Sequence, residues 1–128
     1  MKSVKEYINE ALKLGSSQSR YKYYPETKKE LQNLLKQLIE ERGYDGDFND
    51  IDTSEITDMS SLFSGTALGI YRFNGDISGW DVSNVTDMSF MFANCKNFNQ
   101  DISNWVVSSV TTMVGMFHNS VFDGDISK

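Results

Sequence analysis

The chain has 128 residues, the length of a single domain, and on folding it can bury roughly two thirds of its extended-chain surface. Hydrophobic residues make up 39% and charged residues 23%, with one Pro and nine Gly, so the composition excludes a disordered chain and a collagen-like one. No apolar run approaches the roughly 20 residues that cross a bilayer. One Cys and one His exclude a disulfide framework and most His-rich metal sites.

Charge is unevenly distributed along the chain, whose net charge is −6. Residues 1–43 hold nine Lys or Arg against six Asp or Glu, whereas residues 44–128 hold three against twelve. Because an acidic body repels phosphate backbones, we expect a protein partner with a basic surface and no nucleic acid. Charged residues interrupt the first 14 residues, unlike a secretory signal, and no lipobox cysteine follows, so we expect a cytoplasmic protein that contacts no membrane.

The first predicted element is an amphipathic helix over residues 1–14, where apolar side chains recur every three or four positions. Residues 15–19 break this pattern with Gly and Ser, so this helix is either docked or free. Three tyrosines between residues 20 and 24 favour a short strand, which Pro25 ends.

A second helix is predicted to begin after Thr27. Thr27 and Glu30 form a capping box, in which the two side chains bind amides that the first helical turn leaves unpaired. Leucines and one isoleucine then follow at helical spacing until Gly43, the expected left-handed residue at the end of the helix. We expect residues 1–43 to form a helical cap over the first edge of the next region.

From residue 44 onward the sequence repeats itself. Each copy opens on an aromatic residue and continues with an acid, an isoleucine or phenylalanine, a tryptophan or isoleucine, spaced valines and a Met-Phe pair. Such a unit cannot bury its apolar face alone, so we expect successive units to stack. The predicted units are 44–72, 73–97, 98–121 and a partial 122–128.

Within a unit, the spacing predicts a strand, a corner, a helical turn and a second corner. Val82 and Val85 flank a short extended segment, while Met88, Met91 and Phe92 have the spacing of one helical turn. Stacking at a constant rise would place one large side chain of each unit in a single file. This file holds Ile51, Trp80 and Trp105.

Residues 73–92 read Phe-Asn-Gly-Asp-Ile-Ser-Gly-Trp-Asp-Val-Ser-Asn-Val-Thr-Asp-Met-Ser-Phe-Met-Phe. This sequence closely resembles the BspA-type leucine-rich repeat of bacterial surface proteins and mycoplasma lipoproteins, and the resemblance covers about two thirds of the chain. It implies a right-handed solenoid used for protein binding or adhesion. We therefore expect an α/β solenoid, a leucine-rich-repeat-like stack of about three 25-residue units with an N-terminal helical cap.

Four aspartates occupy one column of the repeat, at positions 47, 76, 101 and 125. In a stack these carboxylates would lie about 5 Å apart and would repel unless each accepts backbone hydrogen bonds at a corner or a cation lies between them. We favour turn capping, with a cation ladder as the alternative. This column consists of Asp47, Asp76, Asp101 and Asp125.

No motif of a hydrolase, phosphate loop or metalloenzyme is present, so we expect neither an enzyme nor a cofactor. Cys95 and His118 fall in non-equivalent slots, and a nucleophile pair would need them in contact, so we favour a partly buried cysteine and a solvated histidine. The repeated methionines are expected to fill the core beside phenylalanines. These methionines are Met59, Met88, Met91, Met113 and Met116.

We expect a non-catalytic protein-interaction module. Alternatives are a phage-type inhibitor that blocks a host defence enzyme and a fragment of a surface or adhesion protein. By analogy with leucine-rich-repeat proteins, the contact residues would lie in the strand columns, where Val106 replaces an aspartate of the other units. Phe122 and Ile126 either fold over the third unit as a minimal lid or leave a C-terminal edge that pairs with another copy or with a target protein. The predicted contact residues are Ser78, Asp81, Ser83, Asn84, Ser103, Asn104, Val106 and Ser108.

Overall fold

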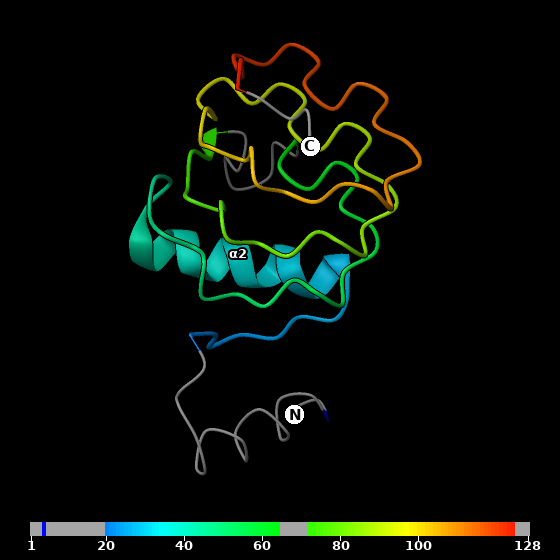
Figure 1. Cartoon of the computed structure of the whole chain (residues 1–128). Helices are drawn as coiled ribbons and strands as arrows, with labels where there is room; N and C mark the ends of the chain where they lie inside the picture. Colours follow the sequence, from blue (N-terminus) through cyan, green and yellow to red (C-terminus); the bar gives the residue numbers. More distant parts are fainter. Residues whose placement is uncertain (1–3, 5–19, 65–71, 125–128) are drawn as a thin grey trace.

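The computed structural model describes residues 4, 20–64 and 72–124, so the helix predicted over residues 1–14 lies outside the described residues except for Val4. A single long helix, α2 (Lys28–Arg42), lies along one end of a stack of coils (Figure 1). Within the described residues, no helix has both the length and the apolar character needed to cross a bilayer.

Helix α2 begins and ends where the sequence predicts. The hydroxyl of Thr27 accepts a hydrogen bond from the N–H of Glu30, whose carboxylate accepts one from Glu26 at 2.7 Å. At the other end, the N–H of Gly43 donates to the carbonyl of Ile39 at 2.7 Å, and its φ of 83° favours glycine. One face of the helix is fully buried in the core. Its buried residues are Leu31, Leu35 and Leu38.

Three coils follow α2 and stack in parallel. We call residues 44–64 the first coil, 73–97 the second and 98–121 the third. Isolated parallel bridges join Asp58 to Asp87 and Asp87 to Thr112. These partners are 29 and 25 residues apart, so the predicted repeat steps are confirmed between these coils.

The predicted α/β solenoid is wrong. The described residues contain one long helix and no strand, and the bridges between the coils are isolated rather than part of a sheet. The strand predicted over residues 20–24 is reduced to a single bridge between Tyr23 and Ile51. The helical turn predicted over residues 88–92 is also absent, because Phe90 has a φ of 56°, which a right-handed helix does not allow.

Short turns explain why no strand forms. Asp76, Asp81 and Asp87 each accept a hydrogen bond from the backbone N–H two residues later, at 3.0, 3.0 and 2.9 Å. This Asx geometry bends the backbone. Because the bends recur every five or six residues, no extended run lasts long enough to form a regular ladder.

Phenylalanines form two adjacent columns through the core. Phe63, Phe92 and Phe117 stack with ring centroids 5.3 and 5.5 Å apart. A second column alternates with the first at centroid distances of 4.4, 4.2 and 4.5 Å. Four of the five predicted core methionines are buried and Met113 is partly buried against the core, so that prediction is confirmed. The second column consists of Phe73, Phe98 and Phe122.

The two tryptophans make the same contact one coil apart. The indole N–H of Trp80 donates to the carbonyl of Phe48 at 3.0 Å, and that of Trp105 donates to the carbonyl of Ile77 at 3.1 Å. Phe48 and Ile77 are equivalent residues of the repeat. Ile51 is buried at the corresponding position of the first coil. Each tryptophan therefore ties its coil to the preceding one.

Candidate functional site

The eight predicted contact residues fall on neighbouring coils. The N–H of Thr111 donates to the carbonyl of Thr86 at 2.8 Å, so the 25-residue step aligns the columns of the two coils. The structure therefore places equivalent members of the set on adjacent layers. Ser78, Asp81, Ser83 and Asn84 belong to the second coil, and Ser103, Asn104, Val106 and Ser108 belong to the third.

On the second coil, side chains of this set form hydrogen bonds within the chain. The carboxylate of Asp81 accepts hydrogen bonds from both the N–H and the hydroxyl of Ser83. The side-chain amide of Asn84 donates to the carbonyl of Ser54 in the first coil at 2.8 Å. These contacts explain the repeated residue types by folding rather than by recognition.

The aspartate column predicted to cap turns does so where it is described. The N–H and the hydroxyl of Ser78 both donate hydrogen bonds to the carboxylate of Asp76. These hydrogen bonds lower the pKa of the Asp76 carboxyl below its ordinary value. Asp47 and Asp101 make the equivalent turns, whereas Asp125 lies outside the described residues. No group of three potential metal-binding side chains occurs among the residues that the structure describes.

The third coil differs from the second in carrying exposed valines. Val106 stands where Asp81 caps a turn, and its side chain is 56% exposed, as the sequence predicts for a surface position. Val114 is 65% exposed on the same coil. Isolated exposed apolar residues are common, but each of these two is next in sequence to a residue that lines an apolar cavity, Val107 and Met113 respectively.

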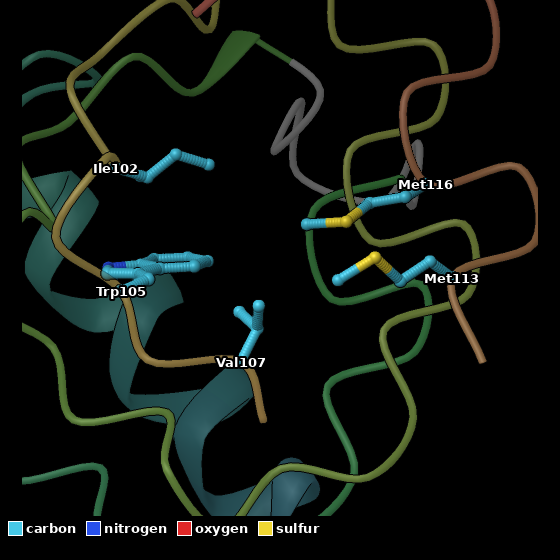
Figure 2. A pocket seen from close by; sticks show the side chains of 5 residues that line it. All are labelled: Ile102, Trp105, Val107, Met113 and Met116. Carbon is cyan, nitrogen blue, oxygen red and sulfur yellow. The ribbon is translucent and has the colours of Figure 1, made fainter. Parts of the chain in front are cut away.

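This cavity, of about 10 Å³, lies within the third coil. Figure 2 shows Trp105 and Val107 on one side and Met113 and Met116 on the other, with their side chains pointing toward one another. Its lining is almost wholly apolar and includes Ile102. The sequence places these residues in the core, and Ile102, Trp105 and Met116 are buried there, whereas Val107 and Met113 are only partly buried.

Phe122 was predicted to lie on a self-association edge. Its ring stacks on Phe117 and Phe98 at 4.5 and 5.8 Å, and it is partly buried. Phe122 therefore continues the aromatic column of its own chain. Ile126, its predicted companion, lies outside the described residues.

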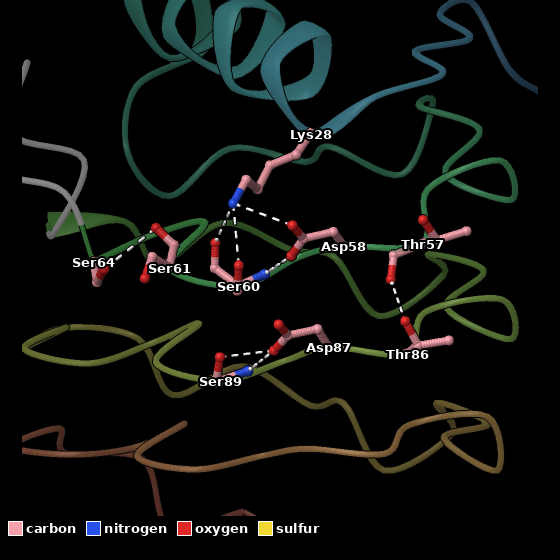
Figure 3. A network of polar contacts seen from close by, with 9 residues as sticks. All are labelled: Lys28, Thr57, Asp58, Ser60, Ser61, Ser64, Thr86, Asp87 and Ser89. Atoms are coloured by element: carbon pink, nitrogen blue, oxygen red, sulfur yellow. Dashed lines mark hydrogen bonds and ion pairs between the residues drawn. The ribbon is translucent and has the colours of Figure 1, made fainter.

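The opposite end of the stack is covered. The ammonium group of Lys28, in the first turn of α2, lies 3.2 Å from the carbonyl oxygen of Ser60 and 3.4 Å from a carboxylate oxygen of Asp58 (Figure 3). The Lys28 ammonium group thus donates a hydrogen bond to a backbone carbonyl of the first coil that faces away from the second coil. The two ends of the stack are thus chemically different.

Cys95 and His118 do not form a nucleophile pair. Cys95 is buried, its thiol donates to the carbonyl of Phe63 at 3.2 Å, and burial raises its pKa to about 12. His118 is exposed on the third coil. The thiol is thus held as a neutral core group, more deeply buried than the sequence predicts.

A second hollow, which sequence reasoning missed, lies where the cap meets the first coil. It is lined by Arg20, Lys22, Arg42, Asp47, Asn49 and Asp50. Arg42 binds both carboxylate oxygens of Asp50 at 2.9 Å. The guanidinium group thereby lowers the pKa of the Asp50 carboxyl. Because Arg42 of α2 and Asp50 of the first coil pair with each other here, this hollow is better explained as an attachment of the cap than as a ligand site.

Comparisons with known proteins give a family but no activity. A family model described as "Mycoplasma protein of unknown function, DUF285" matches residues 29–128. No curated protein and no solved structure matches the chain.

Proposed function

Since the chain belongs to this family of unknown function, we propose from its own geometry that it is a non-catalytic protein-interaction module that binds through the third coil. The supporting observation is the incomplete burial of four apolar side chains of that coil, although their counterparts 25 positions earlier are buried. The partly buried residues are Val107, Val110, Met113 and Phe117, and their buried counterparts are Val82, Val85, Met88 and Phe92.

An apolar end of a stack is stabilised when another surface covers it. Terminal units of repeat proteins need a polar outer face for solubility, and larger exposed apolar patches commonly mark interaction sites. Helix α2 provides a cover at one end of this stack. We infer that a partner covers the partly buried apolar side chains of the third coil.

The charge of the repeat region indicates the kind of partner. Residues 44–128 carry twelve acidic against three basic side chains. Opposite charges around an apolar contact favour encounter and fix orientation. We therefore propose a protein partner with a basic rim around an apolar patch. The polar residues Asn104 and Ser108, exposed on the third coil, belong to the proposed contact surface.

We further propose that the repeat is of the BspA type. The support is the recurrence of its columns in this sequence, from the aromatic start of each unit to the Met-Phe pair. Protein binding is the role that this resemblance implies. The Asx turns described above account for the acids and serines of the motif without assigning any of them a catalytic task.

Site-specific crosslinking tests the module. A photoreactive amino acid placed at Val106 or Val114 should crosslink one protein, identified by mass spectrometry, in a lysate of the cells that encode the chain. The same group at Asn33, exposed on α2, is the control. Excess unlabelled chain should compete. Equal labelling from all three positions, or no product from the third coil, would contradict the proposal.

A conservative variant sharpens this test. Val106→Asp introduces the aspartate that Asp81 provides at the equivalent position of the second coil. Because the new carboxylate can accept a hydrogen bond from Ser108, as Asp81 does from Ser83, the fold should be retained. Crosslinking from Val114 should nevertheless fall, because a charge replaces exposed apolar surface. Unchanged crosslinking in this folded variant would exclude Val106 from the contact.

The acidity also favours a second candidate function, an inhibitor of phage type that occludes the nucleic-acid channel of a host enzyme. In that case the crosslinked protein would be an enzyme acting on nucleic acid, and the added chain would reduce its activity in a salt-dependent manner. A crosslinked partner whose activity the chain leaves unchanged would exclude this alternative.

A further inference from the structure

One row of backbone hydrogen bonds recurs between the coils. In the second coil, the N–H groups of alternate residues donate to carbonyls of the third coil at 3.0, 2.9, 2.9 and 2.8 Å. The donors are Met88, Phe90, Phe92 and Asn94, and the acceptors are Thr112, Val114, Met116 and His118. In the first coil, Met59, Ser61 and Phe63 donate in the same way, each at 2.9 Å, to carbonyls of the second.

The third coil repeats the backbone conformation of these donors. Gly115 and Asn119 have φ values of 64° and 55°, against 56° and 63° at Phe90 and Asn94. The local turns also match, since Met91 binds the carbonyl of Met88 and the corresponding residues 116 and 113 do the same. The outward edge of the third coil therefore presents the donor row of the second.

This outward row has no acceptor within the part of the chain that the structure describes. Met113, Gly115, Phe117 and Asn119 supply its N–H groups. The carbonyls of Met113, Gly115 and Phe117 already accept hydrogen bonds from N–H groups three residues later. The edge thus offers donors beside the apolar cavity of Figure 2, and its complement must offer acceptors.

A second copy of the chain is a poor complement. A two-fold pair meeting through this edge would place N–H groups against N–H groups. A head-to-tail array would need the outward carbonyls of the first coil, but α2 covers that end and Lys28 binds the carbonyl of Ser60 (Figure 3). A homodimer through this row is therefore disfavoured, while the homodimer through Phe122 and Ile126 stays a prediction.

We propose that the occupant is a polypeptide segment of another protein that lies along residues 113–119 as a further coil would. It presents backbone carbonyls at every second residue and apolar side chains spaced like Met113, Met116 and Phe117, which cover the cavity. Main-chain hydrogen bonds supply affinity and the apolar side chains supply specificity, as in other cases of strand addition. This inference rests on the proposed function and specifies its mode of binding.

A peptide with the sequence of the third coil can test this mode of binding. A synthetic peptide of residues 109–121 carries the carbonyls that satisfy the second coil and should bind the same row on the third. Because a free peptide loses conformational entropy on binding, we expect a Kd of about 0.1–1 mM. The control peptide has serine in place of Met113, Met116 and Phe117.

Amide hydrogen exchange of the full ¹⁵N-labelled chain reads out the binding. At about 90% occupancy, the amides of Met113, Gly115, Phe117 and Asn119 should exchange about tenfold more slowly, because only the free state exchanges. The control peptide should leave these rates unchanged. No slowing at about 5 mM peptide, or slowing that misses this row, would overturn the inference.

The crosslinking experiment separates this failure from that of the proposed function. A partner crosslinked from Val106 and Val114, combined with an unprotected row, would leave the interaction module standing and reject strand addition. Failure of third-coil crosslinking would reject the module itself.

Discussion

Gly115 combines an unusual backbone conformation with close contact to an aromatic ring. Its φ of 64° favours glycine, and a Cβ added there would lie 2.4 Å from Cε1 of Phe90. Ser61 occupies the equivalent position of the first coil with a φ of 57° and already carries a Cβ. The same turn therefore tolerates a side chain in one coil and excludes it in another.

Gly115→Ala should destabilise the protein by about 2–3 kcal/mol, from backbone strain together with the clash. Ser61→Ala is the matched control and should change stability by less than about 0.5 kcal/mol. Removing the ring in the double variant Phe90→Ala/Gly115→Ala should recover the clash component, measured by urea unfolding as a double-mutant cycle. Additive effects of the two substitutions would contradict the predicted contact.

The bond from Arg42 to Asp50 makes stability depend on pH. Because it lowers the pKa of Asp50 from its ordinary 3.8, the folded state binds fewer protons than the unfolded state in acid. This stabilisation is present above pH 3.8 and is lost as the pH falls through the folded pKa. Arg42→Met should cost about 1 kcal/mol at pH 7 and should flatten the acid limb.

Urea unfolding between pH 2 and pH 7 measures the effect. Lys29→Met, at an exposed position of α2, is the control for removing a positive charge from the helix. Parallel stability curves for the wild type and Arg42→Met would show that the pair does not carry the predicted dependence.

At the scale of elements, the second and third coils offer the same tryptophan contact in different surroundings. Trp80→Phe leaves the carbonyl of Phe48 without its indole donor in the middle of the stack and should cost about 2–3 kcal/mol. Trp105→Phe makes the equivalent change in the third coil, where the indole lines a cavity and so has fewer atoms packed against it. Its cost should be lower, by urea unfolding, and an equal or larger cost would contradict an open end.

Sequence reasoning succeeded for features that a few side chains determine. Thr27, Glu30 and Gly43 are residue types that cap helices, so they indicate where the helix begins and ends, and the apolar columns follow from the repeat. It failed for the coils, because the Met-x-x-Met-Phe spacing is compatible with a helical turn as well as with the observed bends. The positive φ of Phe90, which decides between them, is not favoured by a phenylalanine side chain.

The candidate site was predicted only in part. Val106 was identified because it departs from the acid of its column, and the structure exposes it. The donor row left no such signal, because backbone N–H groups do not depend on residue type. Gly115 and Asn119, which tolerate a positive φ, were its only traces in the sequence.

At the scale of the whole molecule, the two ends of the stack are treated differently. Helix α2 and Lys28 cover the carbonyls of the first coil, whereas no described residue accepts the hydrogen bonds that the third coil offers. A stack with one closed and one open end can bind a partner without changing its own core. Recognition would then extend the repeat rather than fill a pocket.

The most direct measurement is amide hydrogen exchange of the isolated full chain, which compares the paired donor row of the second coil with the outward row of the third. The amides of Met88, Phe90, Phe92 and Asn94 donate to the third coil and should exchange at least about 100-fold more slowly than those of the third coil's outward row. Equal protection of the two rows would mean that the third coil is covered in the free protein and offers no open binding edge. The outward row consists of Met113, Gly115, Phe117 and Asn119.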